Sequence, residues 1–161
     1  MERERREHEM MGREIMTTAE VVENAVLPKC HAVHNDPATP AEGKPLPKVV
    51  AEKSVTSKSP AEWAYERMIL YIKNFEEQLD GEQEVAMGFT GGDAGVLRIE
   101  GMGFFDPDMV TFYGSDQTGT KTQLIQHVTQ LNVLLRALPK AAPGAEPNRI
   151  GFRLAQDLEN K

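Results

Sequence analysis

Two short stretches of the sequence hold side chains that could bind a metal ion or catalyse a reaction. The first is Cys30-His31 with His34, which places a thiol and two imidazoles close together. A zinc site needs three or four such ligands, and the two remaining histidines, His8 and His127, lie far away in the sequence. We therefore expect no zinc site, and we predict no bound metal or cofactor.

The second stretch is acidic. Asp106 and Asp108 flank Pro107, and Asp116 follows in the next polar loop. Gathered at one end of a sheet, these three carboxylates would form a candidate polar site for a hard cation or for acid and base catalysis. Aspartate is also common in turns, because its side chain accepts hydrogen bonds from nearby backbone amides. The turn interpretation accounts for all three residues without a ligand.

His127 lies among amide side chains rather than beside a nucleophile. No serine or cysteine at helical spacing is available for it to activate, so we predict a structural histidine and no catalytic residues. An amide-rich face is unusual, because a purely solvated face carries more charge. We therefore predict that this region contacts another chain. The candidate interaction residues are Gln123, Gln126, His127, Gln130 and Asn132.

The glycine-rich run at residues 91–95 has the composition of a phosphate-binding loop but not its context. Such loops lead from a strand into a helix and continue with a lysine and a serine or threonine. Here the run joins two predicted strands and no such pair follows. A hairpin turn is the better interpretation.

The elements that must position these residues begin with a helix. Ser59-Pro60-Ala61-Glu62 predicts its start, since serine accepts hydrogen bonds from first-turn amides and proline fits the first helical position. The apolar spacing then predicts a helix over 61–80 that ends before Gly81. Its buried face comprises Tyr65, Met68, Ile69, Ile72, Phe75 and Leu79. Its solvated face comprises Glu66, Lys73, Asn74 and Glu77.

Alternating residues predict three strands, at 85–89, 96–104 and 109–113. After a polar loop, Leu124, Val128, Leu131 and Leu135 recur at helical spacing and predict a helix over 121–138. Residues 149–154 fit a fourth strand or a short terminal helix, and the strand is preferred. The sequence therefore predicts an α+β fold, with a small antiparallel sheet of three to four strands packed against two helices and a disordered N-terminal arm.

Composition divides the chain into an arm and a domain. Residues 1–58 are expected to be a mostly disordered arm with short helices at 1–16 and 18–27, and residues 59–161 form the α+β domain. We predict an extended linker over residues 28–59, within which residues 47–50 could add an edge strand. The domain holds 9 basic and 15 acidic residues, a net charge of −6, which disfavours binding to nucleic acid or anionic lipid.

The compartment is predicted from what the sequence lacks. Cys30 is the single cysteine, so no intramolecular disulfide can form. The N-terminal residues alternate Arg and Glu without the apolar stretch of a secretory signal, and no run is long enough to span a membrane. We expect a cytoplasmic protein with no membrane association.

The sequence resembles two known families. GFFDPDMVTFYG at residues 103–114, followed by LIQHVTQL at 124–131, resembles the signature block of an uncharacterised bacterial domain family over about residues 59–155. That resemblance implies no assigned activity.

The N-terminal helix, the alternating strands, the glycine before Phe105-Asp106 and the pair Gln126-His127 are similar to the Hfq and Sm-like RNA-binding fold. This second resemblance implies an RNA-binding ring with Gln126 and His127 near its pore. It requires two strands at 124–138, where the apolar spacing predicts one helix.

These observations favour a non-enzymatic assembly or adaptor module that self-associates or binds a partner protein, with the arm recruiting the partner. One alternative is the Sm-like RNA-binding ring, which predicts salt-sensitive RNA binding. The other is a small enzyme that uses Asp106, Asp108 and His127, which requires an enclosed pocket beside them.

Overall fold

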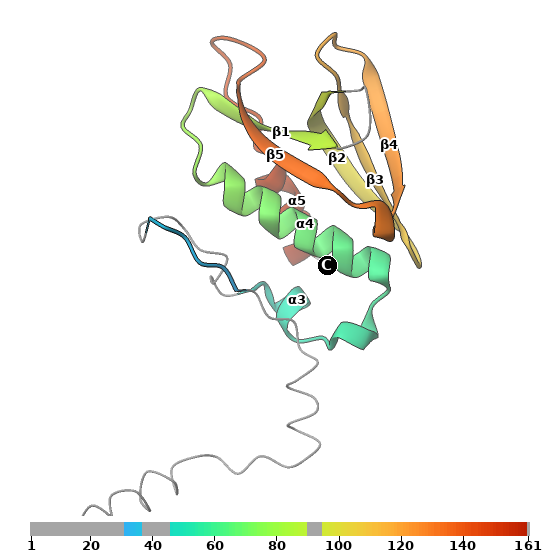
Figure 1. Ribbon diagram of the computed structural model, residues 1–161. Coiled ribbons are helices and arrows are strands. Elements are labelled where there is room, and N and C mark those ends of the chain that lie inside the picture. Colours follow the sequence, from blue (N-terminus) through green and yellow to red (C-terminus); the bar gives the residue numbers. More distant parts are fainter. Residues whose placement is uncertain (1–30, 37–45, 90–94, 161) are drawn as a thin grey trace, which may run out of the picture.

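The computed structural model describes residues 31–36, 46–89 and 95–160. The predicted helices at 1–16 and 18–27, Cys30 and most of the glycine-rich run (91–94) lie outside the described residues. The described elements, in chain order, are α3 (Lys48–Ala51), the 3-10 turn η1 (Val55–Ser57), α4 (Pro60–Glu76), β1 (Gln83–Phe89), β2 (Val96–Phe105), β3 (Met109–Ser115), β4 (Lys121–His127), the 3-10 turn η2 (Val128–Gln130), β5 (Val133–Pro139) and α5 (Ile150–Glu159). Figure 1 shows α4 beneath the sheet, with α3 on the side of α4 that faces away from it.

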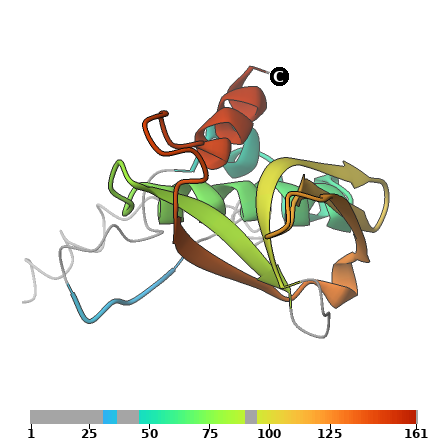
Figure 2. The ribbon, with the colours of Figure 1, turned by 90° about the horizontal axis from the view of Figure 1, so that it is seen from above.

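The five strands form one antiparallel sheet in the order β4-β3-β2-β1-β5. β5 pairs with β1 along its whole length. The start of β2 pairs with β1 and the rest with β3, and the register shifts between Ile99 and Gly101. An irregularity of this kind bends a strand and increases its twist. Figure 2 shows that the sheet is strongly curved. The α+β class is confirmed, and the described sheet has five strands rather than the three to four predicted.

α4 begins as the sequence predicts. The hydroxyl oxygen of Ser59 accepts a hydrogen bond from the Glu62 amide at 3.1 Å, and Pro60 occupies the first turn. Large apolar side chains on one face of α4 then pack against the sheet in the hydrophobic core. Each buried side chain stabilises the fold by about 1.5–3 kcal/mol. The buried residues of this face include Tyr65, Ile69 and Ile72. Glu66, predicted to be solvated, is buried.

The predicted helix at 121–138 is wrong, because this segment forms β4, η2 and most of β5. Along β4, more exposed and less exposed residues alternate, which is the period of a strand. The 3-10 turn then shifts the phase, so that Leu124, Val128, Leu131 and Leu135 keep helical spacing without forming a helix. All four still pack against the core, as the sequence predicts.

Two shorter segments also differ from the prediction. The strand preferred at 149–154 is instead the start of helix α5, in which Ile150, Leu154 and Leu158 recur every four residues and are all buried. Lys48–Ala51 forms a helical turn rather than an edge strand. Val50 of that turn is buried, and α3 contacts α5.

Candidate functional site

His127, at the end of β4, is fixed by hydrogen bonds on both ring nitrogens. Nδ1 accepts a hydrogen bond from the Thr129 amide at 3.2 Å, so the ring proton lies on Nε2. Nε2 donates to a carboxylate oxygen of Asp108 at 3.0 Å. The Gln130 side chain accepts from the His127 amide at 2.9 Å. These contacts tie η2 to the turn between β2 and β3, which is a structural use of the histidine.

Asp106 and Asp108 belong to this same turn but have different partners. Asp106 accepts a hydrogen bond from the hydroxyl group of Ser59, the residue that caps α4. The Pro107 carbonyl accepts from the Ala61 amide at 2.9 Å, which adds a second link to α4. The turn is therefore clamped between the start of α4 and η2, and both carboxylates serve the clamp.

Asp116 follows the opposite end of β3 from Asp108, about 26 Å away along the chain at the usual rise of a strand. One of its carboxylate oxygens accepts from the Thr118 hydroxyl at 2.6 Å, the Thr118 amide at 2.8 Å and the Thr120 amide at 3.0 Å. These bonds, the Thr118 hydroxyl first, hold the pKa of Asp116 below its usual value. The three carboxylates do not gather, and among the described residues no group of three or more His, Cys, Asp or Glu is placed to hold a metal ion.

The five candidate interaction residues do not share one face, because they lie on a strand and a turn rather than on one helix. Gln123 is exposed on the outer side of β4, and Asn132 is exposed just before β5. Gln126 lies on the opposite side of β4 from Gln123, and its buried Oε1 atom has no hydrogen-bond partner in the described part of the chain. Gln130 is engaged with the His127 amide. The structure therefore brings together only His127 and Gln130.

The outer strands, β4 and β5, each have one edge without a strand partner among the described residues. In antiparallel pairs, every second residue directs its amide away from the neighbouring strand. On β5, the Lys140 amide donates to the Glu82 carbonyl at 2.9 Å, which fixes this alternation. The residues of β5 whose backbone groups point away from β1, here called the outward positions, are then Val133, Leu135, Ala137 and Pro139. Because Pro139 has no N–H, it closes one end of the β5 edge.

The same alternation identifies the open edge of β4. The Val128 amide donates to the Asp108 carbonyl, on the side of β3, at 2.9 Å. The outward positions on β4 are therefore Lys121, Gln123, Ile125 and His127. The His127 amide is already bound by Gln130, which closes one end of this edge.

Among the residues that the structure describes, neither open edge has the protection that proteins usually give to edge strands, namely several charges, interior prolines or a covering helix. Lys121 is the charged residue of β4 and is bound to Glu100 at 2.7 Å, and Arg136 is the charged residue of β5. Apolar side chains flank the edges instead, with Ile125 59% and Leu134 58% exposed. An unpaired edge strand with exposed apolar side chains is able to pair with a strand of another chain.

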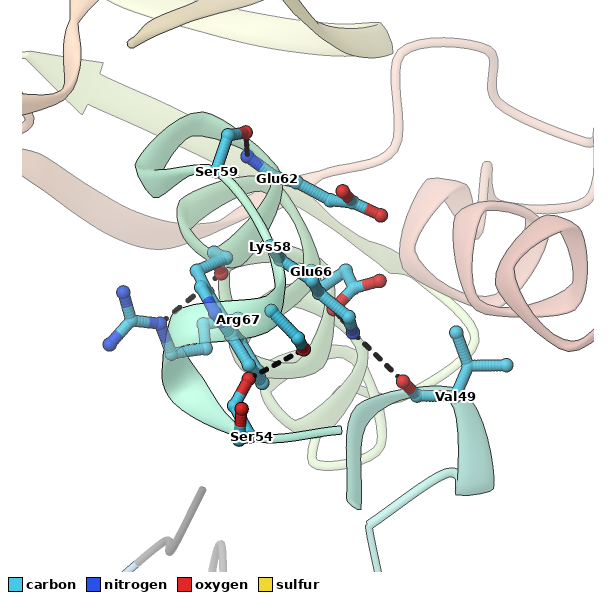
Figure 3. Close-up of polar contacts among 9 residues, drawn as sticks. Val49, Ser54, Lys58, Ser59, Glu62, Glu66 and Arg67 are labelled. Atoms are coloured by element: carbon cyan, nitrogen blue, oxygen red, sulfur yellow. Dashed lines mark hydrogen bonds and ion pairs between the residues drawn. The ribbon is translucent and has the colours of Figure 1, made fainter. Parts of the chain in front are cut away.

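Lys58, which the sequence places in the linker, lies in a buried polar cluster (Figure 3). Its side chain is 1% exposed. Its ammonium group donates to the Glu66 carboxylate and, at 2.8 Å, to the Val49 carbonyl, and it lies 4.4 Å from the centre of the Trp63 ring. The sequence signal for this cluster is slight. Trp63 and Glu66 are three positions apart on a helix, which puts both on one face.

A hollow of about 380 Å³ lies near the end of β5. Its two basic side chains are already paired, since Arg98 donates to Glu84 at 3.0 Å and Lys140 lies 3.4 Å from Glu82. The hollow is lined by Val96, Arg98, Asp116, Gln117, Leu138, Pro139, Lys140 and Ala141. Asp106, Asp108 and His127 do not line it, so it does not provide the pocket that an enzyme using those residues requires.

No described helix has the length and apolar character that crossing a bilayer demands.

Comparison with known proteins places the chain in a family. No curated protein and no solved structure matches the chain. A family model matches residues 54–153, which include α4 and the whole sheet and make up more than half of the sequence. The chain therefore belongs to DUF6173, a family of unknown function, in agreement with the resemblance to an uncharacterised domain family.

Proposed function

We propose that the domain is a non-enzymatic assembly module whose copies join through their open sheet edges. The observation that carries this proposal is the presence of two open edges of seven residues each, β4 and β5, on opposite sides of one sheet. The β4 edge of one copy can accept the β5 edge of the next, so that one sheet continues into the other. Because the two edges differ, the contact repeats until a ring closes or a filament grows.

The open amides favour one register between copies. Antiparallel overlap of the open amides, those of residues 121, 123 and 125 with those of 137, 135 and 133, places Gln123 opposite Leu135 and Ile125 opposite Val133 of the next copy. The exposed side chain of Leu134 then lies beside Leu124, which packs against the core of its own copy. Each exposed apolar side chain thereby gains an apolar neighbour, and burial of such pairs stabilises the contact.

Other registers leave hydrogen-bonding groups unused. A shift by two residues in one direction places His127 opposite Val133 and Pro139 opposite Lys121, and each pair lacks a donor, because the His127 amide is already bound by Gln130 and Pro139 has no amide hydrogen. A shift in the other direction leaves the open amides of Ile125 and Ala137 outside the junction. The two closed ends therefore support the register that pairs only open amides.

Ala137→Pro tests the proposal, because it removes an outward amide from β5 without removing a hydrogen bond to β1. We expect the wild-type chain to form oligomers by light scattering and Ala137→Pro to be monomeric at the same concentration. Ala137→Ser keeps the amide and is the matched control, which should assemble as the wild type does. Circular dichroism checks that all three chains are folded. A folded wild-type chain that remains monomeric at every concentration would contradict the proposal.

A second candidate, an RNA-binding ring of the Hfq and Sm-like kind, is favoured by one observation. That resemblance requires two strands at 124–138, and this segment contains the end of β4 and most of β5. It would place Gln126 and His127 near the RNA. The net charge of −6 over residues 59–161 opposes this candidate.

Fluorescence anisotropy with single-stranded oligoadenylate and oligouridylate tests the second candidate. RNA binding should weaken as salt is raised and should be lost in a Gln126→Ala/His127→Ala variant. Thr129→Ala, which loosens the same turn without removing either residue, is the control. No binding at low salt would reject the RNA-binding candidate and leave the assembly module unaffected.

A further inference from the structure

Glu76, the last residue of α4, places its carboxyl group at the start of α5. The residue is only 5% exposed. One carboxylate oxygen, Oε1, accepts a hydrogen bond from the Phe152 amide at 3.1 Å. The other oxygen, Oε2, is buried and has no hydrogen-bond partner among the described residues. A carboxyl group is thus enclosed at a helix N-terminus with one of its two oxygens unpaired.

Gly151 makes room for this contact. A Cβ atom at position 151 would lie 2.3 Å from the Glu76 Oε1 atom and 2.8 Å from the Lys73 backbone nitrogen. The two helices can therefore approach this closely only because the residue has no side chain. The first turn of α5 is built around the carboxyl group of Glu76.

Arg149 is the charged group that acts on Glu76 from the segment before α5. Its guanidinium donates to the Gln83 carbonyl at 2.7 Å and to the Asp80 carbonyl at 2.8 Å. Burial raises the pKa of Glu76 to about 7, because the Phe152 amide, Arg149 and the Gly151 amide offset only part of the cost of burying the charge. In the sequence, the other charged residues within three positions of Glu76 or Phe152 are Lys73, Glu77 and Arg153.

We propose that Glu76 is a pH-responsive latch, which holds the first turn of α5 against α4 when protonated and releases that turn when ionised. The closed state binds the proton more tightly than the open state, where the carboxyl group regains its ordinary pKa of 4.5. The equilibrium constant for opening therefore rises with pH between about 4.5 and 7, by up to about tenfold per pH unit, and is level above that range.

Release of this turn uncovers apolar surface that α4 and α5 bury together. Ile150 and Leu154 of α5 and Ile72 of α4 are all members of the hydrophobic core. A change of pH between about 4.5 and 7 therefore alters the fraction of time for which this apolar surface is exposed. The latch involves neither β4 nor β5, so it does not depend on assembly through the open edges.

Amide hydrogen exchange on the full chain tests the latch. The exchange rates of the Phe152 and Arg153 amides, corrected for their intrinsic pH dependence, are measured from about pH 5 to about pH 8. We expect protection to fall by up to about tenfold per pH unit until about pH 7 and then to level off. In Glu76→Gln, protection should not depend on pH. Glu77→Gln removes an exposed carboxylate from the adjacent position and should keep the wild-type profile.

A second measurement needs no variant. A carbon-13 NMR titration of the Glu76 carboxyl group in the wild-type chain should show a midpoint near 7. A midpoint near the ordinary value of 4.5, or wild-type protection that does not change with pH, overturns the proposal. Loss of protection over the whole sheet in the same pH range also overturns it, because the event would then be global unfolding.

Discussion

At the scale of single residues, the ammonium group of Lys58 shows how the domain accommodates a buried charge. It has lost contact with water and gained a carboxylate, a carbonyl oxygen and the face of an indole ring. Such pairing offsets the desolvation of both charges, whereas loss of one partner leaves the other charge buried and uncompensated. The cluster also fixes where α3 lies against α4, because Val49 belongs to α3 and Glu66 to α4.

Lys58→Met should therefore lower the free energy of unfolding by about 3–5 kcal/mol, because it leaves the Glu66 carboxylate without a partner. A double variant that also carries Glu66→Leu should recover most of this loss. Urea denaturation followed by circular dichroism measures both changes. Lys53→Met removes an exposed lysine from the same segment and should change the free energy of unfolding by less than about 0.5 kcal/mol. Equal losses in the single and double variants would show that the lost pairing is not the cause.

The adjacent residues Lys58 and Ser59 differ in how far sequence predicts them. The cap at Ser59 is local, since its partner is the Glu62 amide, and a short motif is enough to predict it. The burial of Lys58 depends on how closely α3 approaches α4. The spacing of residues around Lys58 does not predict this contact. For the same reason, the contact of Glu76 with Phe152, far apart in sequence, could not be predicted.

At the scale of elements, local signals predict α4 and the first three strands, but they do not predict the last two. The apolar residues between Leu124 and Leu135 reach the core in either a helix or a strand, turn and strand. What decides between these structures is the pairing of β5 with β1, which supplies a full set of hydrogen bonds to residues far earlier in the chain. The spacing of apolar residues within one segment gives no information about a pairing partner that lies far away in the sequence.

The close approach of β2 and β3 at Gly114 gives a prediction for the sheet. A Cβ atom at this position would lie 2.3 Å from the Arg98 carbonyl oxygen. Gly114→Ala should force the two strands apart and lower the free energy of unfolding by about 1–3 kcal/mol. Gly81→Ala, whose added carbon would have no atom within 4 Å, is the matched control. Thermal denaturation compares the two, and equal melting temperatures would contradict the predicted strain.

At the scale of the whole molecule, the proposed assembly contact joins two different edges, so a chain with one blocked edge keeps the other. Gln123→Pro should block the β4 edge, as Ala137→Pro blocks the β5 edge, and each variant alone should be monomeric. Mixed together, they should form a 1:1 dimer, because one variant retains its β5 edge and the other its β4 edge. Native mass spectrometry resolves the mixed species. A contact between two identical edges would instead leave one of the variants dimeric by itself.

The sheet order also bears on how the chain is made. β1 and β5 are neighbours in the sheet, but the whole of β2, β3 and β4 is synthesised between them. Until β5 leaves the ribosome, the nascent chain has a central strand with one side bare, and pairings between such distant segments form slowly. Chaperones that shield exposed strands would therefore be most useful to this protein in the interval between translation of β1 and translation of β5.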